Sequence, residues 1–203
     1  MMYSATMAGD IKDTCRRFMR EPFEVIIDQE KQLTLDGLIQ YYCNLQDNQK
    51  TRKLIELLDS LMFNQVVIFV KNVNSAIALD KLLQAENFPS VAFHSKLTQD
   101  ERIKRYSDFK AFNKRIMVST DVFGRGIDIE KINVVFNYDM PEEADSYLHR
   151  VGRAGRFGTK GLAISFISSP ENTEVLNEIQ KRFEADIKDL PAEIDTQSYM
   201  NNS

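Results

Sequence analysis

The segment "QVVIFVKNVNSAIALDKLLQAENFPSVAFH", residues 65–94, holds two short apolar runs separated by a stretch with a helical pattern. The runs at 65–70 and 90–94 are rich in β-branched and aromatic residues and have the length of buried strands. Between them, residues 74–87 repeat apolar side chains at helical spacing. A strand, a helix and a second strand in this order predict two parallel strands joined by a right-handed crossover.

The same alternation continues along the rest of the chain. Further strands are predicted at 115–119, 133–138 and 161–167, and further helices at 47–61, 98–112 and 170–183. The first of these helices is expected to open on an Asp47 cap, and the second on a capping box made by Thr98 and Glu101. The pattern predicts an α/β fold of three layers, with a mostly parallel central sheet and helices on both faces.

The composition is that of a soluble globular protein. The chain has 203 residues, of which 43% are hydrophobic and 28% charged, and its net charge is −4. An acidic chain has no bulk attraction for a polyanion, so any nucleic-acid contact has to be local. Cys15 and Cys43 fit no disulfide or metal pattern and indicate a reducing compartment. The longest apolar run, 66–70, is far too short to span a bilayer, so we expect an intracellular protein without a membrane segment.

Ligands of such sheets bind outside the carboxyl ends of the strands. This rule selects the segments 71–72, 94–96, 120–128 and 139 onward. In "STDVFGRGIDI" (119–129), Gly124 and Gly126 let the backbone approach a ligand closely. Thr120 supplies a hydroxyl, Arg125 a charge and Asp128 a carboxylate that could accept from a sugar hydroxyl. Taken alone, such a turn is also typical of an ordinary strand-to-helix connection.

A cluster of arginines lies in "HRVGRAGRFGTKG" (149–161), where Arg150, Arg153 and Arg156 are spaced three apart. On a helical turn this spacing brings like charges near one face, where they repel. We therefore expect them to be neutralised from outside the segment, by a polyanion or by a neighbouring carboxylate cluster. A solvated basic face is the simpler alternative.

Two features limit the phosphate and metal chemistry of this sequence. None of its eight glycines is followed by Lys, so it lacks the Gly-Lys-Ser/Thr loop that cradles phosphates. Acidic residues follow the strand at 133–138, but "PEEAD" (141–145) is more typical of an acidic helix start than of a Mg²⁺ site. We predict no metal site in the chain.

Five short segments occur in order and at fitting intervals: "SAT" (4–6), "VIFVKN" (67–72), "HSKLTQDER" (94–102), "STDVFGRGID" (119–128) and "HRVGRAGR" (149–156). Together they resemble the second RecA-like domain of the DEAD-box RNA helicases, from motif III to motif VI. Longer stretches such as "FNYDMPEEADSYLHR" and "FGTKGLAISF" are similar to the branch that acts in pre-mRNA splicing and mRNA export. The resemblance covers nearly the whole chain. Gly152 is as expected for most DEAD-box proteins but departs from the export branch, where Ala is expected in many members.

The resemblance implies a domain division and a larger protein. Residues 1–30 would be the tail of a first RecA-like domain plus the interdomain linker, and 31–203 the second RecA-like domain. A helical stretch that stops at Pro22 and a lone strand-like "FEVII" agree with such a tail. We expect the chain to be an excised part of a longer protein, whose first domain holds the phosphate loop and the Mg²⁺ box. A stand-alone RecA-like module that binds RNA or protein without catalysis is the alternative.

For ATP, the resemblance implies a site between the two domains, with Mg²⁺ and most ATP contacts held by the first. The residues that it assigns to ATP here are Gly126, Asp128 (to the ribose), and Arg153 and Arg156 (arginine fingers to the γ-phosphate). His149 and Arg150 would couple this site to the other domain, where Ser4 and Thr6 belong to the "SAT" motif. An ordinary half-buried helix histidine is the alternative for His149.

For RNA, the resemblance implies that the domain binds the phosphate backbone of one strand without reading its sequence. The RNA partner is expected to be single-stranded or duplex. The residues that it assigns are Arg102, Thr120, Gly124 and Arg125. Arg102 could instead pair with Glu101 or Asp108 on its helix surface. ATP and RNA would each favour domain closure, and therefore each other's binding. Export or splicing factors are expected as partners, with a nuclear location that allows shuttling to the cytoplasm.

Overall fold

The computed structural model describes residues 9–19, 23–24, 37–121, 129–155 and 159–200. The chain divides into two compact units, Met1–Thr34 and Leu35–Ser203. In the first unit, helix α1 (Gly9–Phe18) lies within the predicted helical stretch, and Arg16 pairs with Glu24. Most of the predicted strand at 23–27 lies outside the described residues. The assignment of this unit to the end of a preceding domain stays a prediction.

The second unit is built on a sheet of seven strands in the order β3-β4-β2-β5-β6-β1-β7. Every adjacent pair in it is parallel. The strands are β1 (Leu38–Asn44), β2 (Gln65–Phe69), β3 (Ser90–Phe93), β4 (Ile116–Ser119), β5 (Ile132–Asn137), β6 (Gly161–Ile167) and β7 (Ile187–Asp189). All five predicted strands are present. Strands β1 and β7 were not predicted.

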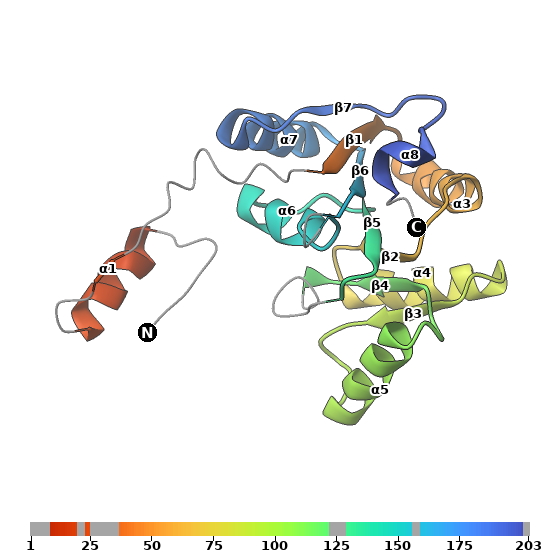
Figure 1. Cartoon of the computed structure of the whole chain (residues 1–203), viewed down its shortest axis with the longest axis horizontal. Helices are drawn as coiled ribbons and strands as arrows, with labels where there is room; N and C mark the ends of the chain where they lie inside the picture. The colour runs from red at the N-terminus through yellow and green to blue at the C-terminus, as the bar shows by residue number, and fades with distance from the viewer. Residues whose placement is uncertain (1–8, 20–22, 25–36, 122–128, 156–158, 201–203) are drawn as a thin grey trace. The chain divides into compact units, whose positions relative to one another are not determined.

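Most of the helices connect successive strands, and the last, α8, follows β7 (Figure 1). They are η1 (Asp47–Gln49), α3 (Lys50–Ser60), α4 (Val73–Ala85), α5 (Gln99–Lys110), α6 (Ala144–Val151), α7 (Pro170–Phe183) and α8 (Thr196–Tyr199). The capping box of Thr98 and Glu101 is confirmed at the start of α5. The predicted Asp47 cap is wrong, because Gln46 caps a short 3-10 turn that then continues into α3.

Helices pack on both faces of the sheet because alternate strand residues point to opposite sides. Ile68 packs in one apolar cluster with Leu58 of α3 and Leu83 of α4. Its neighbour Phe69 packs in a second cluster with Phe109 of α5. The predicted three-layer α/β architecture is therefore confirmed. Within the described ranges, no helix is both long enough and apolar enough to cross a membrane.

Candidate functional site

The described parts of the segments selected by the strand-end rule, 71–72, 94–96, 120–121 and 139 onward, follow the carboxyl ends of strands in the sheet. Because the strands are parallel, their carboxyl ends meet at one edge of the sheet, and the order β3-β4-β2-β5 makes these four ends neighbours. Ser119, the last residue of β4, donates its hydroxyl to the carbonyl of Phe93 at the end of β3 (2.9 Å). Thr120 follows directly and is half-buried.

Arg150 of α6 is held at this edge by opposite charge and by carbonyl oxygen. Its guanidinium donates twice to Asp121, from Nε to Oδ1 (2.6 Å) and from NH2 to Oδ2 (3.0 Å). It also donates to the carbonyl of Asp139 (2.7 Å) and lies 5.2 Å from the ring centre of Phe69. The side chain is 2% exposed. For Arg150, the neutralising partner expected from the sequence is therefore a carboxylate.

Arg153 lies beyond the helix that carries Arg150. Helix α6 ends at Val151, so the prediction that the arginines share one helical face is wrong for these two. Arg153 donates from Nε to the carbonyl of His149 (3.0 Å) and is 7% exposed. His149 itself is half-buried, as its alternative interpretation also requires. The turn closes at Gly155, where φ is +69°, a conformation that side chains rarely adopt.

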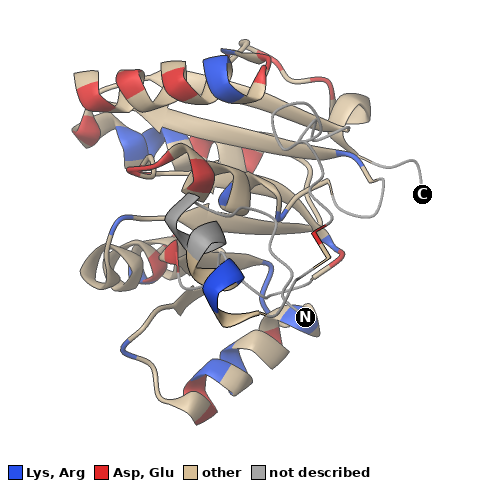
Figure 2. Ribbon diagram, turned by 90° about the vertical axis from the view of Figure 1, so that its left-hand side faces the viewer, with Lys and Arg blue, Asp and Glu red and all other residues tan. Residues whose placement is uncertain are grey.

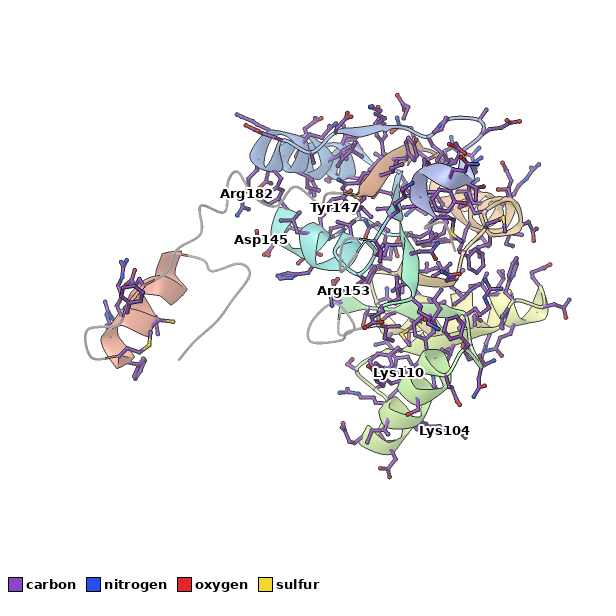
Figure 3. The ribbon with its side chains drawn as sticks, viewed as in Figure 1. Lys104, Lys110, Asp145, Tyr147, Arg153 and Arg182 are labelled. Carbon is purple, nitrogen blue, oxygen red and sulfur yellow. The ribbon has the colours of Figure 1, made fainter. Side chains whose placement is uncertain are left out.

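The arginine motif runs across a face of the sheet rather than along its carboxyl edge alone. Arg150 contacts strand ends, whereas Ala154 packs in the same apolar cluster as Phe69 and Leu97. Gly155 then lies against Gly161, the first residue of β6. Figure 3 shows Arg153 near the end of α6 and over the strands. The segments 67–72, 94–102 and 149–155 therefore meet on one face of the sheet, where Phe69, Leu97 and Ala154 share a cluster.

The acidic residues after β5 do not gather into a metal site. Asp139 accepts from the ammonium of Lys50 (3.0 Å) and from the backbone N–H of Lys71 (2.9 Å). Glu142 is exposed, and Glu143 is the N-cap of α6, which agrees with the predicted acidic helix start. Across the part of the chain that the structure describes, no group of three or more Asp, Glu, His or Cys side chains could hold a metal ion.

Lys50 is a buried cation between two carboxylates. Its Nζ lies 2.8 Å from Asp47 Oδ1 and 3.0 Å from Asp139 Oδ1. Burial alone would lower the pKa of Lys50, but the hydrogen bonds that its ammonium donates to both carboxylates, together with their negative charge, outweigh burial and raise its pKa. Lys50 therefore stays charged inside the protein, next to the backbone that Arg150 contacts.

Arg102 is tied to the loop between β3 and α5. Its NH2 donates to the carbonyl of Ser95 (2.7 Å), while Glu101 accepts from Thr98 and Asp108 from Asn113. The expected alternative, a surface pair with Glu101 or Asp108, is thus not what the structure contains. The buried Nε of Arg102 has no hydrogen-bond partner among the described residues, so a donor remains to be satisfied there.

His94 lies beside Arg102 and is nearly inaccessible, with 5% of its surface exposed. Its Nδ1 is likewise buried without a hydrogen-bond partner in the described ranges. Burial lowers the pKa of His94, and the nearby Arg105 lowers it further. The edge between β3 and α5 therefore contains buried nitrogen atoms and positive charge.

The remaining predicted site residues lie outside the described residues. They are Ser4, Thr6, Gly124, Arg125, Gly126, Asp128 and Arg156. Conversely, two residues of the site were missed from the sequence. Asp121 directly follows a predicted strand, which is a usable signal, whereas nothing in the local pattern marks Lys50 as buried. Basic and acidic residues are interspersed over the ribbon, in keeping with local rather than bulk charge (Figure 2).

Residues 49–158 match the sequence profile of the family described as "Helicase conserved C-terminal domain". The chain is 61% identical to the ATP-dependent RNA helicase uap56 of Schizosaccharomyces pombe, over 99% of this chain and 46% of that protein. It is 57% identical to the ATP-dependent RNA helicase WM6 of Drosophila melanogaster, over 98% of this chain and 47% of that protein. The chain thus spans about half the length of the relatives that it matches.

Solved structures give the same fold. Saccharomyces cerevisiae Dbp5 bound to RNA and ADP BeF3 aligns with a TM-score of 0.87 at 29% identity, over 93% of this chain and 50% of that chain. The C-terminal domain of the DEAD-box protein Dbp5 aligns with a TM-score of 0.72 at 32% identity, over 78% of this chain and 92% of that chain. The three-layer fold is therefore the RecA-like one.

Proposed function

The chain belongs to the family of helicase conserved C-terminal domains, in its DEAD-box branch, and we propose that it is the C-terminal half of an ATP-dependent RNA helicase. One observation carries the proposal. Segments from the ends of β2 and β3 and from the arginine motif converge on one side of the sheet, where Phe69, Leu97 and Ala154 share a cluster. Relatives with 57% and 61% identity are ATP-dependent RNA helicases, which supports the same activity for the whole protein.

In this proposal Arg153 and Arg156 act as arginine fingers on ATP bound between two RecA-like domains. A finger stabilises the charge of the transferring phosphoryl group and is worth roughly 10³–10⁵ in rate. Arg153 fits this role because its Nε is held by the carbonyl of His149, which fixes the plane of the guanidinium. Asp128 would bind the ribose and Gly126 would approach the nucleotide. A first domain would hold Mg²⁺, since phosphate loop and acidic box are expected there.

The RNA grip is proposed for Arg102 and Thr120, together with Gly124 and Arg125. Arg102 is half-buried and its NH2 is tied to the carbonyl of Ser95 (2.7 Å), which places its guanidinium at the loop after β3, and a phosphate oxygen would complement its charge. Contacts with phosphates alone carry no sequence information, so binding would not depend on sequence. The Dbp5 structure with RNA and ADP BeF3 has the same fold over 93% of this chain, which supports an RNA site on this domain.

Coupling to the first domain is proposed for His149 directly and for Arg150 indirectly. Arg150 uses its guanidinium within this domain, on Asp121 and the Asp139 carbonyl. It would therefore act by fixing α6, whereas the half-buried His149 is proposed to link the ATP site to the other domain, to which the motif with Ser4 and Thr6 is assigned. Splicing or mRNA-export factors as partners, and a nuclear location, follow from the stretches similar to that branch and stay part of the proposal.

The test is an ATP hydrolysis assay on the full-length protein, with and without single-stranded RNA. We expect hydrolysis that rises with RNA, and RNA affinity that rises with a non-hydrolysable ATP analogue. RNA binding that is indifferent to nucleotide, without hydrolysis, would instead identify a stand-alone binding module. RNA of mixed sequence and homopolymers should stimulate to a similar extent.

A further inference from the structure

Asp139 is the junction between two charged groups that lie on different helices. Its carboxylate accepts from Lys50 Nζ (3.0 Å) and from the N–H of Lys71 (2.9 Å), so both oxygens are engaged. Its backbone carbonyl accepts from Arg150 NH1 (2.7 Å), and its N–H donates to the carbonyl of Phe69 (3.1 Å). The side chain of Asp139 is thus fixed by α3, while its main chain fixes α6.

The chain of contacts continues through Arg150 to the end of β4. Arg150 binds both carboxylate oxygens of Asp121, and its NH1 also lies 3.4 Å from Asn137 Oδ1. Asn137 in turn donates to the hydroxyl of Ser165 on β6 (3.0 Å). These contacts therefore connect the start of α3, at Lys50, to the ends of β2, β4 and β5. They also reach α6, the helix that precedes Arg153.

Stability is a poor explanation for this arrangement. Taking the cations of Lys50 and Arg150 and the carboxylate of Asp139 out of water is costly, and replacing a buried ion pair by apolar side chains is often neutral or stabilising. Geometry is a better explanation, because catalytic groups must be held within about 0.5 Å of their productive positions. A misplacement of about 1 Å can cost roughly 100-fold in rate.

We propose that Lys50 and Asp139 form a positioning pair, which holds Arg150 and α6 so that Arg153 presents its guanidinium to the transferring phosphate. The inference rests on the proposed function of Arg153. Neither Lys50 nor Asp139 touches ATP or RNA in this arrangement; both act through the backbone of residue 139 and through Arg150. The pair extends the functional site to α3, which packs on the face of the sheet opposite to the one that Ala154 contacts.

The test compares variants of the full-length protein in RNA-stimulated ATP hydrolysis. Lys50→Met keeps the apolar stem and removes the ammonium, so kcat should fall at least tenfold while KM for ATP stays within threefold. Lys50→Arg retains a cation for Asp139 and should recover kcat to within threefold of the parent. Lys53→Met is the matched control, because Lys53 lies one turn along α3 and pairs with Glu56 at the surface; it should leave kcat unchanged.

A second variant and a melting curve guard against simple misfolding. Asp139→Asn keeps the shape of the side chain and should lower kcat like Lys50→Met. The positioning role is wrong if Lys50→Met keeps kcat within threefold of the parent. It is also wrong if, in both variants, the loss of kcat is accounted for by a lower melting temperature. Arg153→Lys is measured in parallel. Full activity of Arg153→Lys would refute the proposed finger role of Arg153, on which the inference rests. An inactive Arg153→Lys together with an active Lys50→Met would refute only the positioning role of Lys50 and Asp139.

Discussion

Arg150 and Asp121 form a two-point ion pair that joins α6 to the end of β4, with N–O distances of 2.6 and 3.0 Å. The arginine side chain is 2% exposed and the aspartate side chain 60% exposed, so the cation depends on a partner that water also reaches. A planar guanidinium that binds both oxygens of a carboxylate fixes orientation as well as distance. The loop that follows β4 and the arginine motif are therefore coupled inside this domain.

Asp121→Asn should destabilise the folded chain, because it leaves the buried guanidinium of Arg150 without its counter-charge. We expect the free energy of unfolding to fall by about 1.5–3 kcal/mol, the usual range for a lost hydrogen bond to a charged group. Urea denaturation of the 203-residue chain measures it. Asp145→Asn is the control, since Asp145 pairs with Arg182 at the surface and should cost at most about 1 kcal/mol (Figure 3). Equal losses in both variants would contradict the prediction.

The 203-residue chain alone should not hydrolyse ATP. The sequence has no Gly-Lys phosphate loop, and the arginine fingers stabilise charge on a phosphate that another domain has to bind. The purified chain is assayed for phosphate release with and without RNA. Turnover that persists in the double variant Arg153→Ala, Arg156→Ala would reveal a second nucleotide site.

How much of the fold could be predicted depended on how deeply each strand is buried. Strand β2 is buried along its whole length, so its apolar run was recognisable. Strand β1, "LIQYYCN", is half-buried at most positions, and β7 buries only Ile187 of its three residues. Neither has a continuous apolar run, although both complete the sheet. Partial exposure near a sheet edge therefore removed the signal on which the prediction relied.

The site was predictable in its residue types but not in its partners. Three arginines in an acidic chain predicted a counter-charge, yet the partner of Arg150 is Asp121, 29 residues earlier. The sheet order β4-β2-β5 leaves the ends of β4 and β5 one strand apart, so that Arg150 reaches across β2 to Asp121, and no local pattern encodes this order. The burial of Lys50 depends on the same order, since its partner Asp139 follows β5.

Stability should fall as the pH is lowered below about 6.5, in part because of His94. Burial, and then Arg105, lower the pKa of His94 in the folded state. At pH values between the lowered pKa and the ordinary value near 6.5, the unfolded chain therefore binds more protons than the folded chain. The contribution of His94 to the free energy of unfolding is complete above pH 6.5 and is lost as the pH falls toward the lowered pKa. The slope from one proton is at most about 1.4 kcal/mol per pH unit. Urea denaturation at pH 7.5 and 5.5 should show a smaller difference for His94→Gln than for the parent; an equal difference would exclude His94.

Arg153→Lys and Arg156→Lys should each lower RNA-stimulated turnover of the full-length protein sharply, with folding and basal RNA affinity nearly intact. Lysine keeps the charge, but an ammonium cannot contact two phosphate oxygens with a rigid fork. Steady-state ATP hydrolysis under saturating RNA measures the effect. Arg182→Lys, which changes an arginine on the exposed side of α7, is the control and should be silent. Turnover within threefold of the parent in the finger variants would refute their assignment.

Arg102→Ala should weaken RNA binding by the full-length protein regardless of RNA sequence. Arg102 is proposed to neutralise one phosphate, and each neutralised phosphate of a single strand contributes about −0.7 to the slope of log affinity against log salt. The slope should therefore become shallower by about 0.7. RNA affinity is measured with a non-hydrolysable ATP analogue at a series of salt concentrations, for parent and variant.

The control for this measurement is Lys104→Ala, which removes the same charge from the same helix. Lys104 and Lys110 are exposed on α5 (Figure 3). Arg102 instead donates to the Ser95 carbonyl in the loop after β3. A general loss of positive charge would alter the two salt slopes alike. A phosphate contact at Arg102 would alter the slope only in Arg102→Ala, because counterions leave the RNA only where a side chain neutralises a phosphate. If Arg102→Ala leaves both the salt slope and the RNA affinity unchanged, the RNA contact is wrong. Arg102 would then have only a structural role, in which its hydrogen bond to Ser95 holds the loop after β3 against α5.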